Sequence, residues 1–208
     1  MSKVIIMSIQ PKWLAKILNG EKTIDIRKTM PKCELPIDVY LYCMKNKTML
    51  CDFGDNEFPY KNGGYELSSD LINIKNHDAK ILNGKVVAKF TLNKIEEIMN
   101  FNWEAQTATL SPFDLSLKSC ISIKDLNNEF IDCKAYYIDN LVIFDKPMEL
   151  REFSTSPYTD WVQYRVRKAP QSWQYAWLFE SSSTMRTKTR WECRGTREIE
   201  LRAKEEKQ

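Results

Sequence analysis

Three charged side chains within six residues form the strongest chemical feature of the sequence. Lys22, Asp25 and Arg27 follow a glycine at position 20, and polar and apolar residues alternate over residues 23–27, which predicts a strand. Asp25 and Arg27 then share one strand face. Two cations and a carboxylate could bind a phosphate or a base edge, with Asp25 accepting from an exocyclic amine. The same pattern also fits a solvated face whose ion pair contributes about 0–1 kcal/mol.

The elements around this cluster are mostly short strands. A helix is predicted over residues 10–20, because Pro11 suits a first helical position, an apolar stripe follows, and Gly20 suits the left-handed stop. Apolar and β-branched runs predict strands at 3–8, 37–44, 85–92, 135–144 and 172–179. Short helices are predicted at 94–99 and 122–130.

Two segments fall outside this pattern. Residues 45–83 lack a period and are rich in Asn, Gly and Asp, which indicates an insertion or long loop. Beyond Glu180 a serine linker leads into a charged segment. We therefore expect one domain over residues 1–180 and a flexible tail over 181–208.

The net charge of +3 is unevenly distributed over the 208 residues. Residues 184–208 contain eight basic and five acidic side chains, which leaves 23 of each sign in the body. A neutral body does not suit binding to nucleic acid through bulk charge. A nucleic-acid role must then be local, in a pocket or in the tail.

Targeting and metal signals are weak. No apolar run approaches the roughly 20 residues of a membrane helix, and the first apolar residues are too few for a secretory signal, so we expect a cytoplasmic protein without a membrane role. The six cysteines show no Cys-x-x-Cys spacing, and the single histidine, His77, has no His or Cys within four residues. We expect reduced, mostly buried thiols and neither a metal site nor a cofactor.

Several segments resemble one family. The segments 8–13 (SIQPKW) and 17–28 (ILNGEKTIDIRK) resemble the signature of the ASCH (activating signal cointegrator homology) family, whose hallmark is Gly-x-Lys-x-x-Glu-x-Arg. Asp25 stands where that pattern has Glu. Four more segments, in matching order, resemble members from phages, prophages and Firmicutes: 84–90 (GKVVAKF), 137–141 (YIDNL), 145–147 (DKP) and 169–173 (APQSW).

The resemblance implies an α+β fold, a small PUA-like β-barrel with a helix between its first two strands and further short helices packed on it. It also implies a cleft lined by Lys22, Asp25 and Arg27 that binds RNA or a modified base or nucleotide. Aromatic candidates for contacting a base in this cleft are Trp13, Tyr42 and Trp173, although such residues more often pack in a core or at a rim.

Two other functions stay open. Some small ASCH proteins are amidohydrolases that act on N4-acetylcytidine through the motif lysine, a threonine three residues later and a distal glutamate. Here Lys22 and Asp25 would be the catalytic residues, and Asp25 replaces the threonine. The distal carboxylate could be Glu96, Glu97 or Glu104, and Asp25 is expected to raise the pKa of Lys22. The third function is a phage-type protein that binds a host factor through residues 45–83 or the tail.

Overall fold

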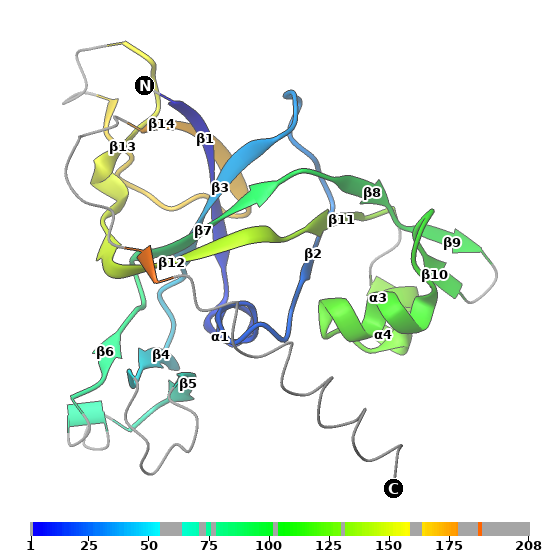
Figure 1. The fold of residues 1–208 in the computed structure, drawn as a ribbon, viewed down its shortest axis with the longest axis horizontal. Helices are drawn as coiled ribbons and strands as arrows, with labels where there is room; N and C mark the ends of the chain where they lie inside the picture. Colours follow the sequence, from blue (N-terminus) through cyan, green and yellow to red (C-terminus); the bar gives the residue numbers. More distant parts are fainter. Residues whose placement is uncertain are drawn as a thin grey trace, which may run out of the picture.

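The computed structural model describes residues 2–54, 64–70, 74–75, 78–101, 104–129, 132–158, 164–178 and 187–188. The fold is α+β, with many strands and few short helices, as predicted (Figure 1). Its largest part is a seven-stranded sheet in the order β13-β14-β1-β3-β7-β12-β15. The strands of this sheet are β1 (Ser2–Ile9), β3 (Ile37–Cys43), β7 (Val86–Leu92), β12 (Asp139–Met148), β13 (Phe153–Ser154), β14 (Trp173–Leu178) and β15 (Thr187–Lys188).

Strand β1 lies inside this sheet and is buried on both faces. It pairs antiparallel with β14 and parallel with β3. Ile5 and Met7 belong to one apolar cluster, whereas Val4 and Ile6 belong to another, as the alternation of a strand requires. Helix α1 (Pro11–Leu18) follows β1 directly and contributes most of its apolar side chains to the first cluster. The predicted first strand and first helix are thus confirmed.

The sheet is open among the described residues. Its end strands, β13 and β15, have neighbours on one side only. The α+β class is confirmed, but the predicted barrel is not.

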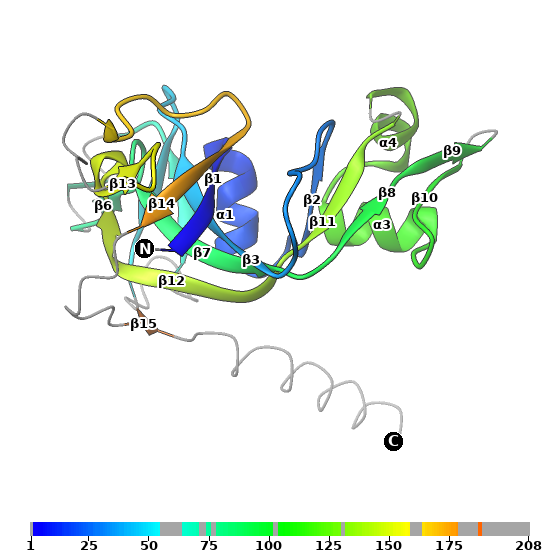
Figure 2. The ribbon, with the colours of Figure 1, turned by 90° about the horizontal axis from the view of Figure 1, so that it is seen from above.

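A smaller lobe extends from the main sheet (Figure 2). It contains a three-stranded sheet in the order β2-β11-β8, the hairpin of β9 and β10, and two helices. These elements are β2 (Ile24–Arg27), β8 (Ile95–Glu97), β9 (Met99–Phe101), β10 (Glu104–Gln106), α3 (Pro112–Ser119), α4 (Ile123–Glu129) and β11 (Lys134–Tyr137). Ile24 and Ile26 of β2 pack with Leu115 and Leu126 of the helices in a separate apolar cluster.

Two local predictions were wrong in this lobe. Residues 94–99 are not helical, because β8 pairs antiparallel with β11 along the whole of its short length. The strand predicted over 135–144 is two strands, β11 and β12, which belong to different sheets. Asn140 lies at this change of sheet with a φ of 48°. Asparagine tolerates this left-handed conformation better than most residues.

The segment predicted as an insertion contains a second three-stranded sheet, in the order β5-β4-β6. Its strands are β4 (Met49–Asp52), β5 (Tyr65–Ser68) and β6 (Lys80–Ile81). The side chain of Asn19, just after α1, donates to the carbonyl of Tyr65 and accepts from its N–H at 2.9 and 3.2 Å. Asn19 thereby acts as a short strand partner for β5.

Only two residues of the predicted tail, residues 181–208, are described by the structure. Thr187 and Lys188 form β15, which pairs with Phe144 and Ile143 of β12. The rest of residues 181–208, with Cys193, lies outside the described residues, as does His77. None of the described helices has the length and apolar character needed to cross a membrane.

Candidate functional site

The motif lies at a corner between α1 and β2. The backbone N–H groups of Glu21 and Lys22 both donate to the carbonyl of Lys16, and Gly20 takes a φ of 79° that favours glycine. This turn directs Lys22 toward the end of α3. There the N–H of Thr23 donates to the carbonyl of Lys118 at 2.9 Å. The corner therefore satisfies a helix-end carbonyl that would otherwise lack a partner.

Lys22 is almost completely buried, with 2% of its surface exposed. Its Nζ donates to the carbonyl of Ser119 at 2.8 Å and lies 3.4 Å from Oδ1 of Asp25. It also lies 5.4 Å from the ring centroid of Trp13, within range of a cation–π interaction. The ammonium group is thus surrounded by a carbonyl, a carboxylate and an indole.

Burial lowers the pKa of Lys22, because desolvation disfavours the charged amine more strongly than Asp25 favours it. The expectation that Asp25 would raise this pKa is therefore wrong in its net direction. Asp25 does oppose the shift, but it is the smaller effect.

Asp25 is the acceptor that joins the two cations. Burial alone would raise its pKa, but the charges of Arg27 and Lys22 and their hydrogen bonds outweigh burial and lower the pKa. Nε of Arg27 donates to Oδ2 of Asp25 at 2.7 Å. The carboxyl group is consequently ionised at neutral pH, and the three side chains together carry one positive charge when Lys22 is protonated.

Arg27 connects this network to the main sheet. Its Nη1 donates to Oγ of Ser172 at 3.1 Å, and its Nη2 donates to the carbonyl of Ser8 at 3.0 Å. Ser8 and Ile9 are the last two residues of β1, and Ser172 directly precedes β14. One guanidinium group therefore holds β2 against two neighbouring strands of the large sheet, which fixes the distance between the two lobes at this point.

A cavity of about 260 Å³ opens beside the network. Its walls combine the charged side chains with apolar groups and two exposed glutamines, Gln10 and Gln171. The lining residues are Ser8, Ile9, Gln10, Trp13, Lys22, Asp25, Ile26, Arg27, Met44, Ile121 and Gln171. They come from the ends of β1 and β3, from α1 and β2, and from the segments that follow α3 and precede β14. Figure 2 shows that α1 and β2, which both contribute lining residues, are neighbouring elements.

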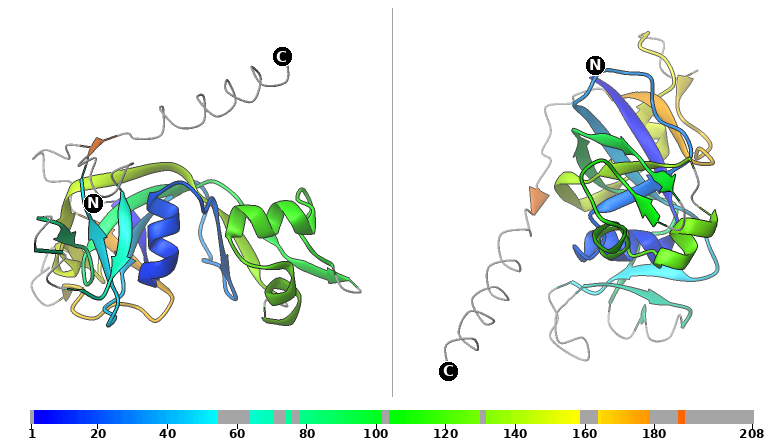
Figure 3. Two further views of the ribbon diagram at one scale, coloured as in Figure 1. Left: turned by 90° about the horizontal axis from the view of Figure 1, so that it is seen from below. Right: turned by 90° about the vertical axis from the view of Figure 1, so that its right-hand side faces the viewer.

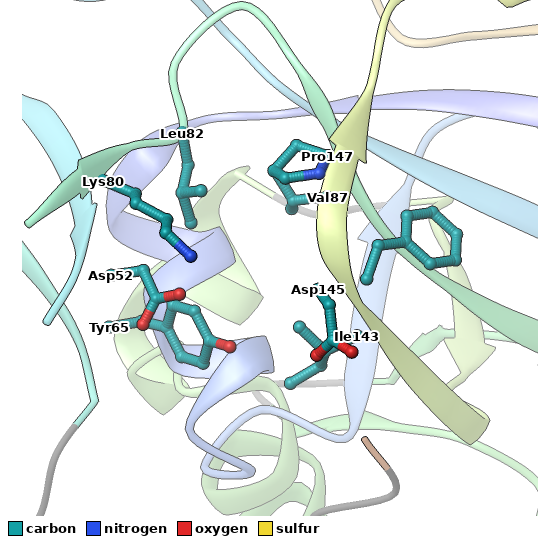
Figure 4. Close-up of a pocket in the computed structure, with 9 residues that line it drawn as sticks. Asp52, Tyr65, Lys80, Leu82, Val87, Ile143, Asp145 and Pro147 are labelled. Carbon is teal, nitrogen blue, oxygen red and sulfur yellow. The ribbon is translucent and has the colours of Figure 1, made fainter. Parts of the chain in front are cut away.

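A second hollow lies near the β4–β6 sheet (Figure 4). Asp52, Tyr65 and Lys80 line one side of it, and Asp145 of β12 lies opposite. Its volume of about 10 Å³ is at the lower limit for one water molecule. The larger cavity is therefore the candidate site.

The structure brings together four of the six predicted ligand-binding residues: Trp13, Lys22, Asp25 and Arg27 all line the cavity. Tyr42 and Trp173 are not among the lining residues. Tyr42 is buried in the apolar cluster on the other face of the main sheet. Trp173 packs edge-on against Tyr175, and its Nε1 donates to Oγ1 of Thr29 at 3.1 Å.

Sequence reasoning missed several groups at the site. The carbonyl of Ser119 binds Lys22 across 97 positions of the chain, and no pattern in the sequence could indicate such a contact. Ser8, Gln10 and Gln171 lie within the quoted family-like segments, so a signal for them was present. Ser172 was predicted only as the first residue of the last strand, and its hydroxyl accepts a hydrogen bond from Arg27.

Two of the three carboxylates considered for catalysis, Glu96 and Glu97, are not among the residues that line the cavity. Glu96 accepts hydrogen bonds from Thr109 and Tyr137 and pairs with Lys94 at 2.7 Å. Although desolvation opposes it, this set of partners lowers the pKa of Glu96 to about 2. Glu97 pairs with Lys134, and the side chain of Glu104 lies outside the described set. Asp25 is thus the one carboxylate among the residues that line the cavity.

Within the described part of the chain, no group of three or more His, Cys, Asp or Glu side chains could hold a metal ion. Cys43 and Cys51 are buried thiols, and burial raises the pKa of Cys43 to about 12. A thiol in this state is a poor nucleophile at neutral pH.

Comparison with known proteins gave a weak structural likeness. No protein-family model matches the chain, and no curated protein does. Crystal structures of an ASCH protein from Zymomonas mobilis are similar to it. A tyrosine-to-phenylalanine mutant is 13% identical, with a TM-score of 0.43 over 86% of this chain and 92% of the other. The unmutated protein is also 13% identical, with a TM-score of 0.42 over 85% and 87%. A similarity this low assigns neither a family nor a function.

Proposed function

We propose that the chain is an ASCH-type, PUA-like module that binds a base of RNA, or a modified base or nucleotide, in the cavity beside Lys22. The observation that carries this proposal is the buried Lys22–Asp25–Arg27 network in the wall of a cavity that also contains an indole. The family-like segments around residues 8–28 support the same conclusion.

The chemistry of the walls suits a planar polar ring better than a free phosphate. Each of the three donors of Lys22 has a neighbour: a carbonyl, a carboxylate and a ring face. Arg27 uses three of its five N–H groups within the protein, so two remain for a ligand. Asp25 compensates part of the positive charge. The remaining walls are largely apolar, and pockets of this kind recognise rings through a few placed polar groups.

A blocking substitution tests this function. Gln171 is exposed at the cavity, so Gln171→Trp should fill the opening without disturbing the core. We expect Gln171→Trp to abolish binding of single-stranded RNA in a fluorescence-anisotropy titration. Ile81→Trp, which enlarges an exposed side chain on β6, is the control and should bind as the wild type does. Equal affinity of the two variants for RNA and for nucleosides would rule out the cavity as the binding site.

A second candidate is hydrolysis of an acylated nucleoside, and the environment of Lys22 favours it. A lysine acts as a base or nucleophile only when it is neutral, and burial moves its pKa in that direction. Incubation with N4-acetylcytidine, followed by measurement of released cytidine, tests this activity. The absence of turnover at high protein concentration, with the nucleoside still bound, would leave binding as the function.

A further inference from the structure

Basic residues predominate in the segments around the cavity, although the chain without residues 184–208 carries no net charge. Three segments reach it: residues 10–18, which are Gln10 and α1; residues 27–33, which are the end of β2 and the segment after it; and residues 165–172, before β14. Together they contain eight Lys and Arg residues and no Asp or Glu. The chain as a whole has 31 basic and 28 acidic residues, so this composition is local to the segments around the cavity.

Five of these eight cations are exposed: Lys12, Lys28, Lys32, Arg167 and Lys168. We call these five residues the basic rim. No salt bridge joins any of them to a carboxylate among the described residues. A cluster of exposed cations without carboxylate partners attracts a polyanion, and this attraction acts over a distance, before any specific contact forms.

Lys12 contacts a cavity residue, and the other four rim residues belong to segments that contain one. Nζ of Lys12 lies 4.7 Å from the ring centroid of Trp13, the indole that also faces Lys22. Lys28 directly follows Arg27, and the next residue, Thr29, accepts the hydrogen bond from Trp173. Arg167 and Lys168 precede Gln171, which lines the cavity. Figure 2 and the left view of Figure 3 show the segments after β2 (blue) and before β14 (orange) reaching the same side of the molecule.

We propose that the base bound in the cavity is presented by a single strand of nucleic acid, whose neighbouring phosphates lie on the basic rim. This inference rests on the proposed function and adds the class of ligand: a polynucleotide rather than a free nucleoside. In the cavity network Lys22 is occupied within the protein and Arg27 keeps two N–H groups for a ligand, so the network recognises the base. The rim cations have no such partners and bind the backbone. A duplex should bind more weakly, because a base must be unpaired and unstacked before it can enter such a pocket.

The salt dependence of affinity tests the rim. The rim variant combines Lys12→Gln, Lys28→Gln and Lys168→Gln. The control combines Lys75→Gln, Lys80→Gln and Lys124→Gln, which removes the same charge from exposed positions on other elements. For a single strand, each phosphate contact contributes about 0.7 to the slope of log affinity against log salt concentration. We expect the rim variant to reduce this slope by about 2 between about 50 and 200 mM salt, and the control to leave it nearly unchanged.

The outcomes separate the two proposals. The inference is supported if the wild type binds an RNA oligonucleotide far more tightly than the free nucleoside and duplex RNA, and only the rim variant loses this advantage. The inference would be overturned if oligonucleotide and nucleoside bound with equal affinity and the rim variant bound RNA as the control variant does. The proposed binding of a base in the cavity would then still stand. Binding of RNA that depends on the rim but survives Gln171→Trp would overturn the proposed function and this inference together. Single-stranded DNA of the same sequence shows whether the ribose hydroxyl contributes.

Discussion

Arg27 donates a 2.7 Å hydrogen bond from Nε to Asp25, two residues before it on the same short strand. The strand alternation places both side chains on one face, so the pair forms without a change in the path of β2. The other nitrogens of Arg27 then bind Ser172 and Ser8 on the main sheet. A planar guanidinium suits this task, because its donors point in fixed directions toward several acceptors. The pair is therefore both a wall of the cavity and the joint between the two lobes.

The first prediction concerns the energy of this pair. Arg27→Gln leaves Asp25 buried with Lys22 as its remaining charged partner, and we expect it to lower the free energy of unfolding by roughly 3 kcal/mol. Asp25→Asn should have a cost of the same order, since it leaves the buried Lys22 and the partly buried Arg27 without their carboxylate. The double variant should lose less than the sum of the single losses, because neither charge is then left without the other. Urea unfolding of the wild type, the two single variants and the double variant measures this coupling. Additive losses would mean that the pair contributes nothing of its own.

The pH dependence of stability gives a second prediction. The pKa of Asp25 is lower in the folded protein than its ordinary value of 3.8. As the pH falls below that value, the unfolded chain takes up the proton before the folded protein does. The stability that Asp25 contributes is therefore fully present above the ordinary pKa and is lost as the pH falls toward the lowered pKa of the folded protein. We expect the unfolding free energy of Asp25→Asn to fall less steeply between about pH 4 and pH 2, by at most about 1.4 kcal/mol per pH unit. Parallel pH profiles of the two proteins would contradict the lowered pKa.

Much of this site could be predicted because its signals are local. Pro11 and Gly20 delimit α1 within the sequence, and alternation alone places Asp25 and Arg27 on one face of β2. The burial of Lys22 could not be predicted in the same way. It depends on α3, a helix that was missed although Ser111 and Pro112 provide a cap and a first helical residue. Few apolar side chains of α3 are buried, and Phe113 and Leu117 are exposed, so its helical pattern is weak.

The erroneous pKa expectation has a related cause. Sequence proximity suggested that Asp25 would dominate the environment of Lys22. The structure adds the desolvation caused by residues distant in the chain, which is the larger effect. The error in residues 94–99 is of the same kind, since β8 exists through its pairing with β11 about 40 positions later. Contacts between residues this far apart in the chain leave no local pattern in the sequence.

The two candidate tryptophans give a third prediction. Trp13 lines the cavity, whereas Trp173 binds Thr29 and packs on Tyr175 outside the lining. Trp13→Leu keeps an apolar residue on α1 but removes the indole, and we expect RNA affinity to fall by about tenfold, within the 1–3 kcal/mol typical of a stacked base. Trp173→Leu should lower the unfolding temperature and leave affinity within about twofold. Anisotropy titrations with thermal unfolding separate the two effects. A larger affinity loss in Trp173→Leu would show that the base lies nearer β14.

The final prediction concerns the β4–β6 sheet, which was expected to be a loop. Asn19 provides both a donor and an acceptor to the backbone of Tyr65, so Asn19→Ala removes two hydrogen bonds at a partly buried position. We expect a loss of about 1–3 kcal/mol in unfolding free energy and faster hydrogen exchange at the Tyr65 amide. Asn93→Ala is the matched control, because the side chain of Asn93 makes one exposed hydrogen bond to Asp139 at 3.2 Å and should cost little. Unchanged exchange at Tyr65 in Asn19→Ala would mean that the segment is held by its apolar contacts with the core, through Leu50 and Leu82, rather than by this side chain.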